Sequence, residues 1–407
     1  MKYLLAAPKT MIAGTIVLEG SKSISNRILL MRALCAEEFP VRNLSPSDDT
    51  NTLQLIIMSD DAVCDVGAAG TTMRFLIAYF AIVSGERILT GSERMKQRPV
   101  KILVDALREL GADITYLEKE GYPPIKIIGK KLNRDRVAVK ADVSSQYISA
   151  LLMIAPRLEN GLRLELTGKI SSYPYIRMTL KLMASLHARY DINGNIFTVH
   201  PGTYAGKELI VESDWSAASY YFSICALAKG THIQIRGLFP ESLQGDSVLP
   251  EIYNALGVKS YFENEILHIV QTNSYTDYFM YDFSDCPDLA QTAVVTCAAL
   301  GIPGTFTGLE SLKIKETDRT NALRTELKKF GVQFYAEGEA WKLEGKTTAS
   351  GPVEIKTYED HRMAMCFAPI SIVHDHITIE DTQVVKKSYP SFWDDLASIG
   401  FSFSSVD

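Results

Sequence analysis

Most residues suited to anion chemistry in this sequence stand at the start of strongly apolar segments. Six such segments begin near Ser21, Ala68, Ser144, Ser213, Pro287 and Glu359. The residues in or just before their first turns are Lys22, Ser23, Arg27, Gly70, Thr71, Arg74, Ser144, Ser145, Gln146, Asp288, His361 and Arg362. If the segments are parallel buried helices, their N-termini converge, and free N–H groups and helix dipoles favour a bound anion there.

Further cations stand in the loops MKQRPV, KIKETDR and VVKKSYP. Together with the helix starts they give eight cations in a chain of net charge −6: Lys22, Arg27, Arg74, Arg98, Lys315, Arg319, Arg362 and Lys387. Such a set suits a small, multiply charged anion, or two phosphorylated ligands bound together. Asp288 and Glu316 are the acid–base candidates among them.

Each of these residues also has an ordinary structural explanation. Ser23 alone fits a helix cap, and the KETDR stretch fits ordinary surface ion pairs. Arg27 and Arg74 lie in the first turns of apolar helices, where a buried guanidinium needs an anionic partner, either a protein carboxylate or a ligand. The pattern G-x-x-x-x-G-K-[ST] is absent, which excludes a Walker A nucleotide site.

A second pattern recurs between the apolar segments. Helical apolar spacing ends at Gly111, Gly257 and Gly331, and two short strand-like segments follow each glycine. Weaker copies end at His187, which takes the place of the glycine, and at Gly400. The stretch NTLQLIIMSDDAVCDVG fits a shortened sixth copy.

The repeat predicts six units of helix–strand–helix–strand–strand, roughly 65 residues each. We expect three units in each of two domains, with domain A formed by residues 1–20 and 214–407 and domain B by residues 21–213. The first 20 residues, with the strand-like TIVLEG, are expected to complete the last unit. Two chain crossings near residues 20 and 213 would permit closure around a ligand in a cleft between the domains.

Composition indicates a globular protein of two or three domains, with 46% hydrophobic and 22% charged residues. The six cysteines form no C-x-x-C pair, so we expect neither disulfides nor a metal site. No segment fits a signal peptide or a membrane span, and we expect a cytoplasmic protein. The acidic net charge and the lack of a basic stripe argue against binding to nucleic acid or to a membrane surface.

Seven motifs together resemble the 3-phosphoshikimate 1-carboxyvinyltransferase (EPSP synthase) family over essentially the whole chain. They are GSKSISNR at 20–27, AGTTMRFL at 69–76, RMKQRP at 94–99, SSQYISALL at 144–152, PDLA at 287–290, KETDR at 315–319 and DHRMAM at 360–365. The resemblance implies an α/β fold of two domains, each with three βαβαββ-type units and parallel buried helices, an inside-out α/β barrel. It implies transfer of the enolpyruvyl group of phosphoenolpyruvate to the 5-hydroxyl of shikimate 3-phosphate, a step toward chorismate and the aromatic amino acids.

The resemblance also implies site residues, carried over motif by motif. Shikimate 3-phosphate would be held by Lys22, Ser23, Arg27, Ser144, Ser145, Gln146, Ser172, Tyr175, Asp288, Ser311 and Lys315. Phosphoenolpyruvate would be held by Lys22, Gly70, Arg98, Gln146, Arg319, Arg362 and Lys387. Asp288 would be the base for the hydroxyl, Glu316 the proton donor and acceptor at C3, and Lys22 the partner of the leaving phosphate.

The family implies no metal or organic cofactor and a monomer. This sequence departs from the usual pattern at Ala68 and Ser311, each in place of Asn, and at Tyr173, in place of Lys. The stretch at 52–68 is short, which is expected to trim the second unit of domain B.

Two alternative functions stay open on the sequence. A UDP-N-acetylglucosamine enolpyruvyl transferase shares the fold and the phosphoenolpyruvate chemistry, but usually has a Cys on the loop near Arg98, where this chain has GSERMKQRP. A catalytically silent binding paralogue would be expected to lack Asp288, Glu316 or Lys22, and all three are present.

Overall fold

The computed structural model describes residues 1–141, 144–168, 170, 172–348 and 351–406. The chain forms two compact units: unit A comprises Met1–Gly20 and Glu212–Asp407, and unit B comprises Ser21–Val211. The second boundary lies two residues before the one expected from the repeat. Ser213 bridges to Gly20 and donates its backbone N–H to the Gly237 carbonyl, so this segment already belongs to unit A.

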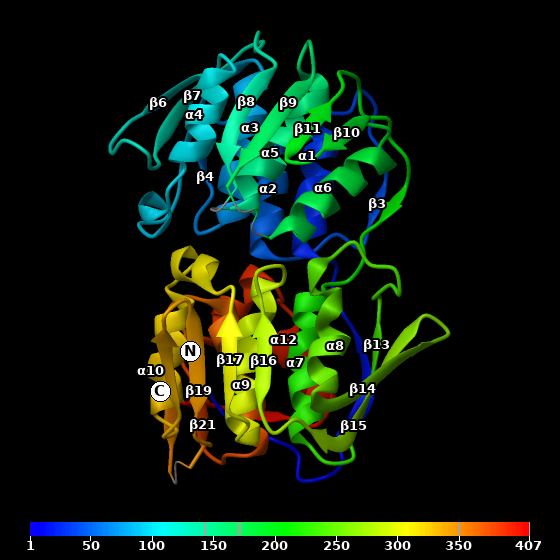
Figure 1. Ribbon diagram of the computed structural model, residues 1–407, viewed down its shortest axis with the longest axis vertical. Helices are drawn as coiled ribbons and strands as arrows, with labels where there is room; N and C mark the ends of the chain where they lie inside the picture. The colour runs from blue at the N-terminus through cyan, green and yellow to red at the C-terminus, as the bar shows by residue number, and fades with distance from the viewer. Residues whose placement is uncertain (142–143, 169, 171, 349–350, 407) are drawn as a thin grey trace. The chain divides into compact units, whose positions relative to one another are not determined.

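Five four-stranded sheets share one topology, and Figure 1 labels those of their strands for which there is room. A strand and a parallel neighbour are joined through a buried helix, and a second helix leads to two antiparallel strands. In unit B these repeats are β4 (Val63–Asp65), α3 (Gly70–Ile82), β5 (Gly85–Thr90), α4 (Lys101–Glu109), β6 (Asp113–Tyr116) and β7 (Ile125–Gly129), then β8 (Arg136–Lys140), α5 (Ser145–Ile154), β9 (Leu162–Thr167), α6 (Tyr173–Ser185), β10 (Tyr190–Asn193) and β11 (Ile196–Val199).

Unit A holds three complete repeats. The first is β2 (Ala13–Val17), α7 (Trp215–Leu227), β13 (His232–Arg236), α8 (Leu249–Asn254), β14 (Leu256–Glu263) and β15 (Ile266–Tyr275). The second is β16 (Phe279–Asp282), α9 (Ala290–Leu300), β17 (Gly304–Thr307), α10 (Arg319–Lys328), β18 (Gln333–Glu337) and β19 (Ala340–Glu344). The third is β20 (Val353–Ile355), α11 (His361–Phe367), β21 (Ile377–Ile379), α12 (Phe392–Ser398), β22 (Ser402–Val406) and β1 (Lys2–Ala6).

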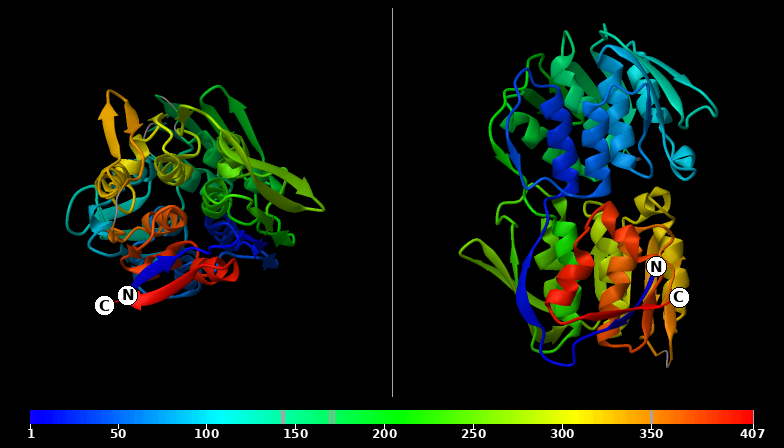
Figure 2. Two further views of the ribbon diagram at one scale, coloured as in Figure 1. Left: turned by 90° about the horizontal axis from the view of Figure 1, so that it is seen from below. Right: turned by 180° about the vertical axis from the view of Figure 1, so that it is seen from behind.

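The first 20 residues serve two repeats rather than one. As expected, β1 completes the last repeat, where it pairs antiparallel with both β21 and β22. Figure 2 shows the two chain ends side by side on this sheet. The expectation for TIVLEG was wrong, because β2 instead pairs in parallel with β13 and supplies the first strand of the fourth repeat.

The shortened repeat is the first one in unit B, not the second as expected from the sequence. It consists of α1 (Lys22–Ala33), β3 (Val41–Arg42), α2 (Asp48–Met58) and β12 (Leu209–Ile210), with β3 and β12 parallel. In the described chain, α2 is followed directly by β4 of the next repeat, and no antiparallel pair lies between them. The short stretch after Thr52 therefore removes the two closing strands of the first repeat.

The helices between parallel strands form the cores of the units, because they are apolar on all faces. Every residue of α7 from Trp215 to Ala226 is buried. Within unit A, α9 packs against both α7 and α11, and within unit B, α3 packs against α5. The predicted helix stops also appear, since Gly111, Gly331 and His187 all have positive φ, 68° for His187.

No helix in the described part of the chain is both long and apolar enough to cross a membrane.

Candidate active site

In unit B, Lys22 joins the starts of three helices. Its Nζ lies 3.1 Å from Oδ2 of Asp49, at the start of α2, and the two side chains are 15% and 8% exposed. Thr72 in α3 donates its hydroxyl to the Asp49 carbonyl at 2.9 Å. Asp49 therefore fixes the ammonium of Lys22 relative to the first turn of α3.

Gly70, the first residue of α3, lies directly beneath the guanidinium of Arg98. A β-carbon on Gly70 would stand only 2.6 Å from Arg98 Cζ. Arg98 follows the 3-10 helix η1 (Met95–Gln97) and is buried. Arg74 ties this loop to α3, because it donates to the Gly70 carbonyl at 2.9 Å and to the Pro99 carbonyl at 3.3 Å.

The start of α5 adds polar groups to the same cluster in unit B. The Ser144 hydroxyl accepts the backbone N–H of Gln146, so Ser144 is the N-cap, and Ser145 is the buried first residue of the helix. The Gln146 amide donates to the Thr71 hydroxyl at 3.0 Å. The starts of α3 and α5 are thus joined by a direct hydrogen bond.

Arg27 is enclosed by neutral groups of unit B. Its guanidinium donates to the Thr179 hydroxyl at 2.7 Å, the Ser23 carbonyl at 2.8 Å and the Ser149 hydroxyl at 3.2 Å. It also lies 6.0 Å from the ring centre of Tyr175. Burial lowers the pKa of Arg27 to about 10, so the group keeps its charge at neutral pH.

Ser172 precedes α6 as its N-cap residue and has a positive φ of 55°. The hydrogen-bond partners of Arg27 are all neutral. Of the two kinds of partner that the sequence left open for this guanidinium, a carboxylate of the described chain is therefore not used.

In unit A, Arg319 is the centre of a buried cluster of carboxylates. Its guanidinium donates to Asp360 at 2.7 Å, Glu316 at 2.9 Å and Asp288 at 3.1 Å. Burial opposes the charge of Arg319, but these carboxylates outweigh burial and raise its pKa above the usual arginine value. The Arg319 side chain is 2% exposed, so it is a fixed charge rather than a mobile one.

Three cationic side chains form ion pairs with Asp288. Arg362 Nη2 lies 3.0 Å, Arg319 Nη1 3.1 Å and Lys315 Nζ 3.7 Å from its carboxylate. Burial raises the pKa of Asp288, but Arg362, Lys315 and Arg319 outweigh burial and hold it well below the usual range. For Lys315, burial is the larger effect and lowers the pKa, while Asp288 opposes that shift.

The start of α11 organises the rest of this cluster. Asp360 caps the helix by accepting the backbone N–H of Arg362 at 2.9 Å, in addition to its bonds from Arg319. Lys387, in the 3-10 helix η7 (Thr382–Lys387), donates to the Glu359 carbonyl at 2.9 Å, one residue before the cap.

Ser311, in the 3-10 helix η5 (Glu310–Ile314), has a buried hydroxyl oxygen with no hydrogen-bond partner in the described chain.

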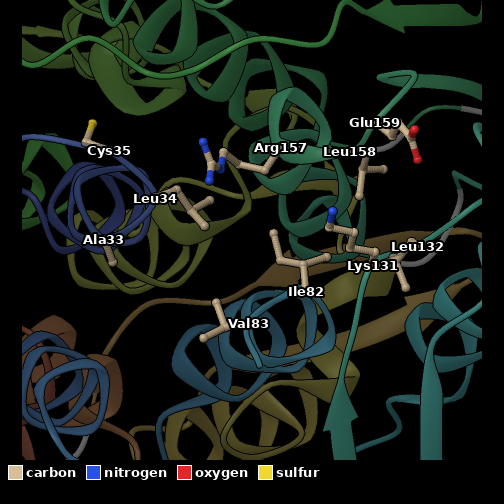
Figure 3. Close-up of a pocket in the computed structure, with 10 residues that line it drawn as sticks. All are labelled: Ala33, Leu34, Cys35, Ile82, Val83, Lys131, Leu132, Arg157, Leu158 and Glu159. Carbon is tan, nitrogen blue, oxygen red and sulfur yellow. The ribbon is translucent and has the colours of Figure 1, made fainter. Parts of the chain in front are cut away.

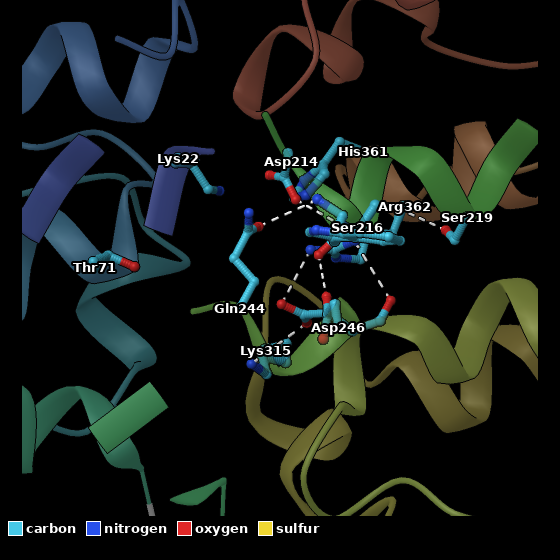
Figure 4. Close-up of polar contacts among 12 residues, drawn as sticks. Lys22, Thr71, Asp214, Ser216, Ser219, Gln244, Asp246, Lys315, His361 and Arg362 are labelled. Carbon is cyan, nitrogen blue, oxygen red and sulfur yellow. Dashed lines mark hydrogen bonds and ion pairs between the residues drawn. The ribbon is translucent and has the colours of Figure 1, made fainter. Parts of the chain in front are cut away.

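Three carboxylates of these clusters, Asp49 in unit B and Asp246 and Asp360 in unit A, were not predicted from the sequence. Asp246 accepts the Ser216 hydroxyl, and Figure 4 shows it beside Arg362. Asp360 is the N-cap of α11, and Asp49 lies in the first turn of α2, where acidic residues are favoured, so the pattern of helix starts could have identified both. Tyr220, which receives a hydrogen bond from Arg362 at 3.4 Å, lies within an apolar run that gives no such signal.

Unit B also has a pocket of about 480 Å³ that none of the predicted site residues line (Figure 3). Its lining residues include Leu34 and Val83, the C-caps of α1 and α3, and Leu158, the C-cap of the 3-10 helix η2 (Ala155–Arg157). It therefore belongs to the helix ends opposite those that hold Lys22, Gly70 and Gln146.

The six-repeat architecture, with cations and carboxylates at buried helix starts, is that of a two-domain α/β enolpyruvyl transferase fold. Two solved structures of EPSP synthase from Acinetobacter baumannii have this fold. One has a TM-score of 0.79 and 20% identity and covers 99% of this chain and 100% of its own. The other has the same TM-score at 19% identity.

Residues 6–59 and 53–396 match the family described as EPSP synthase (3-phosphoshikimate 1-carboxyvinyltransferase). A 3-phosphoshikimate 1-carboxyvinyltransferase of Bacteroides fragilis is 49% identical over 406 residues, covering 98% of both chains. One from Photobacterium damsela subsp. piscicida is 36% identical over 430 residues, covering 98% of this chain and all of its own. The chain belongs to this family, which confirms both the resemblance and the predicted fold class.

Proposed function

We propose that this chain transfers the enolpyruvyl group of phosphoenolpyruvate to the 5-hydroxyl of shikimate 3-phosphate, releasing inorganic phosphate. The observation that supports it most is the buried cluster in which Arg319, Arg362 and Lys315 surround Asp288. A hydroxyl nucleophile needs a base, and two anionic substrates need cations to offset their repulsion.

Shikimate 3-phosphate is proposed to use residues of both units. The phosphate and ring hydroxyls are assigned to Lys22, Ser23, Arg27, Ser144, Ser145, Gln146, Ser172, Tyr175, Asp288, Ser311 and Lys315. The hydroxyl of Ser311 supports its place on this list, because a buried oxygen without a protein partner is satisfied by a ligand hydrogen bond.

Phosphoenolpyruvate is proposed to bind through cations of both units. The residues assigned to it are Lys22, Gly70, Arg98, Gln146, Arg319, Arg362 and Lys387. The contact between Gly70 and Arg98 supports this assignment, since it places a guanidinium over the N-terminus of α3, where an anion is favoured.

The reaction needs one proton added to C3 of phosphoenolpyruvate and one removed from the attacking hydroxyl. Addition at C2 gives a tetrahedral phosphate ketal. Loss of a proton from the new methyl group then expels phosphate and restores the double bond. A positioned acid or base contributes about 10²- to 10⁴-fold to such steps.

Asp288 is proposed as the base for the hydroxyl. In the ligand-free protein Arg362, Lys315 and Arg319 hold its pKa low, which makes it a weak base. Anionic substrates that bind those cations offset their field, and the pKa of Asp288 then rises toward the working range. The base is thereby strengthened only when substrate is present.

Glu316 is proposed to exchange the proton at C3. Arg319 donates to its Oε2 at 2.9 Å and fixes the direction of the carboxyl. Lys22, held by Asp49, is proposed to stabilise the leaving phosphate oxygen.

Product analysis tests this function. Purified protein incubated with phosphoenolpyruvate and shikimate 3-phosphate should give inorganic phosphate and a new enol ether in equal amounts by ³¹P and ¹H NMR. Activity with UDP-N-acetylglucosamine in place of shikimate 3-phosphate would assign the chain to the alternative acceptor. No product with either acceptor, from folded protein, would favour a silent binding paralogue.

A further inference from the structure

Glu212 is a buried carboxylate that takes part in none of the ion pairs of the described chain. The residue is 4% exposed and stands where the chain returns to unit A. A buried charge without a cation is costly unless hydrogen bonds replace its water. The residues around Glu212 therefore need to supply hydrogen-bond donors to its two carboxylate oxygens.

Four donors from three segments converge on the two oxygens of Glu212. Oε1 accepts Trp215 Nε1 at 2.7 Å and the Phe239 backbone N–H at 2.9 Å. Oε2 accepts the Ser242 hydroxyl at 2.7 Å and the Gln244 amide at 3.0 Å. Because all four partners donate, the position requires an acceptor-only group, and a glutamine there would turn its own NH₂ toward donors.

This network fastens the segment 242–246 to the start of α7. The Gln244 amide donates to the Ser213 carbonyl at 2.7 Å, and its oxygen accepts the Trp215 backbone N–H at 3.2 Å. Two residues further on, Asp246 accepts the Ser216 hydroxyl (Figure 4). The segment 242–246 is thus held at one end by the bonds of Ser242 and Gln244 and at the other by the bond of Asp246 to Ser216. These contacts fix the position of Asp246.

Asp246 is 3% exposed, and its Oδ1 has no hydrogen-bond partner in the described chain. The charged or titratable groups that act on it are Asp288, Arg362, Asp214 and Cys286. Two of these, Asp288 and Arg362, belong to the cluster assigned to catalysis. A shift of Asp246 would therefore change the field at the proposed base.

We propose that Glu212 is a positioning residue for the reaction: by gathering four donors it holds the segment 242–246 on α7, and so keeps Asp246 beside Arg362 and Asp288. The inference rests on the proposed function, because its effect is measured on turnover.

The first test is Glu212→Gln, assayed at a temperature where circular dichroism shows the variant fully folded. The isosteric change should lower kcat about 10-fold or more, since small displacements in an active site have large effects on rate. An unchanged kcat in the folded variant would overturn the proposal.

A double-mutant cycle separates positioning from general destabilisation. Glu212→Gln should lower kcat strongly in the wild-type background, but less than about 2-fold in an Asp246→Asn background, because coupled residues are not additive. If the factor is the same in both backgrounds, Glu212 does not act through Asp246, and the proposal is wrong.

Glu326→Gln is the matched control. Glu326 is also a buried carboxylate of unit A and accepts Tyr358 Oη at 2.7 Å and Lys329 Nζ at 2.6 Å, without contact to the segment 242–246. It should lower the melting temperature while leaving kcat within about 2-fold. An equal loss of kcat in this control would show that any buried carboxylate matters, and would contradict a specific role.

Ser242→Ala keeps the test open if Glu212→Gln does not fold. It removes one donor from a half-buried position, and should lower kcat in the wild-type but not in the Asp246→Asn background. Absence of turnover in the wild-type protein would contradict the proposed function. Wild-type turnover with fully active, folded variants would contradict only the role of Glu212.

Discussion

The guanidinium of Arg98 covers the α-carbon of Gly70. The space between them is too small for a side chain, since a β-carbon would come within 2.6 Å of Arg98 Cζ. Gly70 has no positive φ, so its requirement for glycine comes from this approach and not from backbone conformation.

Gly70→Ala should therefore displace Arg98 rather than strain α3. We expect the KM for phosphoenolpyruvate to rise about 10-fold or more, with the KM for shikimate 3-phosphate nearly unchanged, because only the first substrate is assigned to Arg98. Steady-state kinetics with each substrate varied in turn measures the split. Equal increases in both KM values would show a general distortion of unit B.

Asp288→Asn and Glu316→Gln should each lower kcat by about 10²- to 10⁴-fold. Binding of shikimate 3-phosphate should weaken far less than kcat falls in the Asp288→Asn variant, because the amide can still hydrogen-bond the substrate but cannot accept its proton. Isothermal titration calorimetry measures the affinity for shikimate 3-phosphate, and an assay of phosphate release measures kcat. Turnover near the wild-type value in either variant would refute the role given to that residue.

Stability should fall as pH rises through the range in which Asp246 loses its proton. Burial, followed by the charge of Asp288, raises the pKa of Asp246 from 3.8 to about 7. The folded protein therefore binds this proton more tightly than the unfolded chain between those values. The resulting stability is fully present below about pH 4 and is lost as pH rises to about 7.

Asp246→Asn keeps the shape of the protonated side chain and cannot titrate. Relative to wild type, the variant should gain about 1.4 kcal/mol of stability for each pH unit within that range. Urea unfolding of both proteins at pH 5, 6, 7 and 8 measures the difference. Parallel stability curves for the two proteins would show that Asp246 is ionised in both folded and unfolded states.

Arg319→Ala should destabilise unit A by about 3–5 kcal/mol, because Asp360, Asp288 and Glu316 would share a buried site without their common cation. Arg324→Ala provides the control on the same helix. Arg324 is exposed and, among the described residues, donates only to Asn321, so its loss should change stability by less than about 0.5 kcal/mol. Thermal melts of both variants compare the two, and similar shifts would contradict a central role for Arg319.

The buried helices and the residues that end the other helices were predictable, because both depend on the local sequence pattern. The all-apolar runs in α3, α5, α7 and α9 require burial on every face, and glycine or His187 marks the ends of other helices. The strand pairings were harder. Nothing in TIVLEG distinguishes pairing with β13 from completion of the last sheet, because a strand's own residues do not identify its distant neighbour.

The cations of the site were predictable from their place at helix starts, but their partners were not. Asp360 and Asp49 are ordinary N-cap types, and only the folded chain brings them to Arg319 and Lys22. Glu212 has no sequence signal, since its four donors come from residues up to 32 positions away.

The most direct measurement is phosphate release by the purified protein with phosphoenolpyruvate plus shikimate 3-phosphate, and with each compound alone. The proposed function predicts release that requires both compounds and is strongly reduced in Asp288→Asn. Release from phosphoenolpyruvate alone, release that instead requires UDP-N-acetylglucosamine, or no release from folded protein would contradict it.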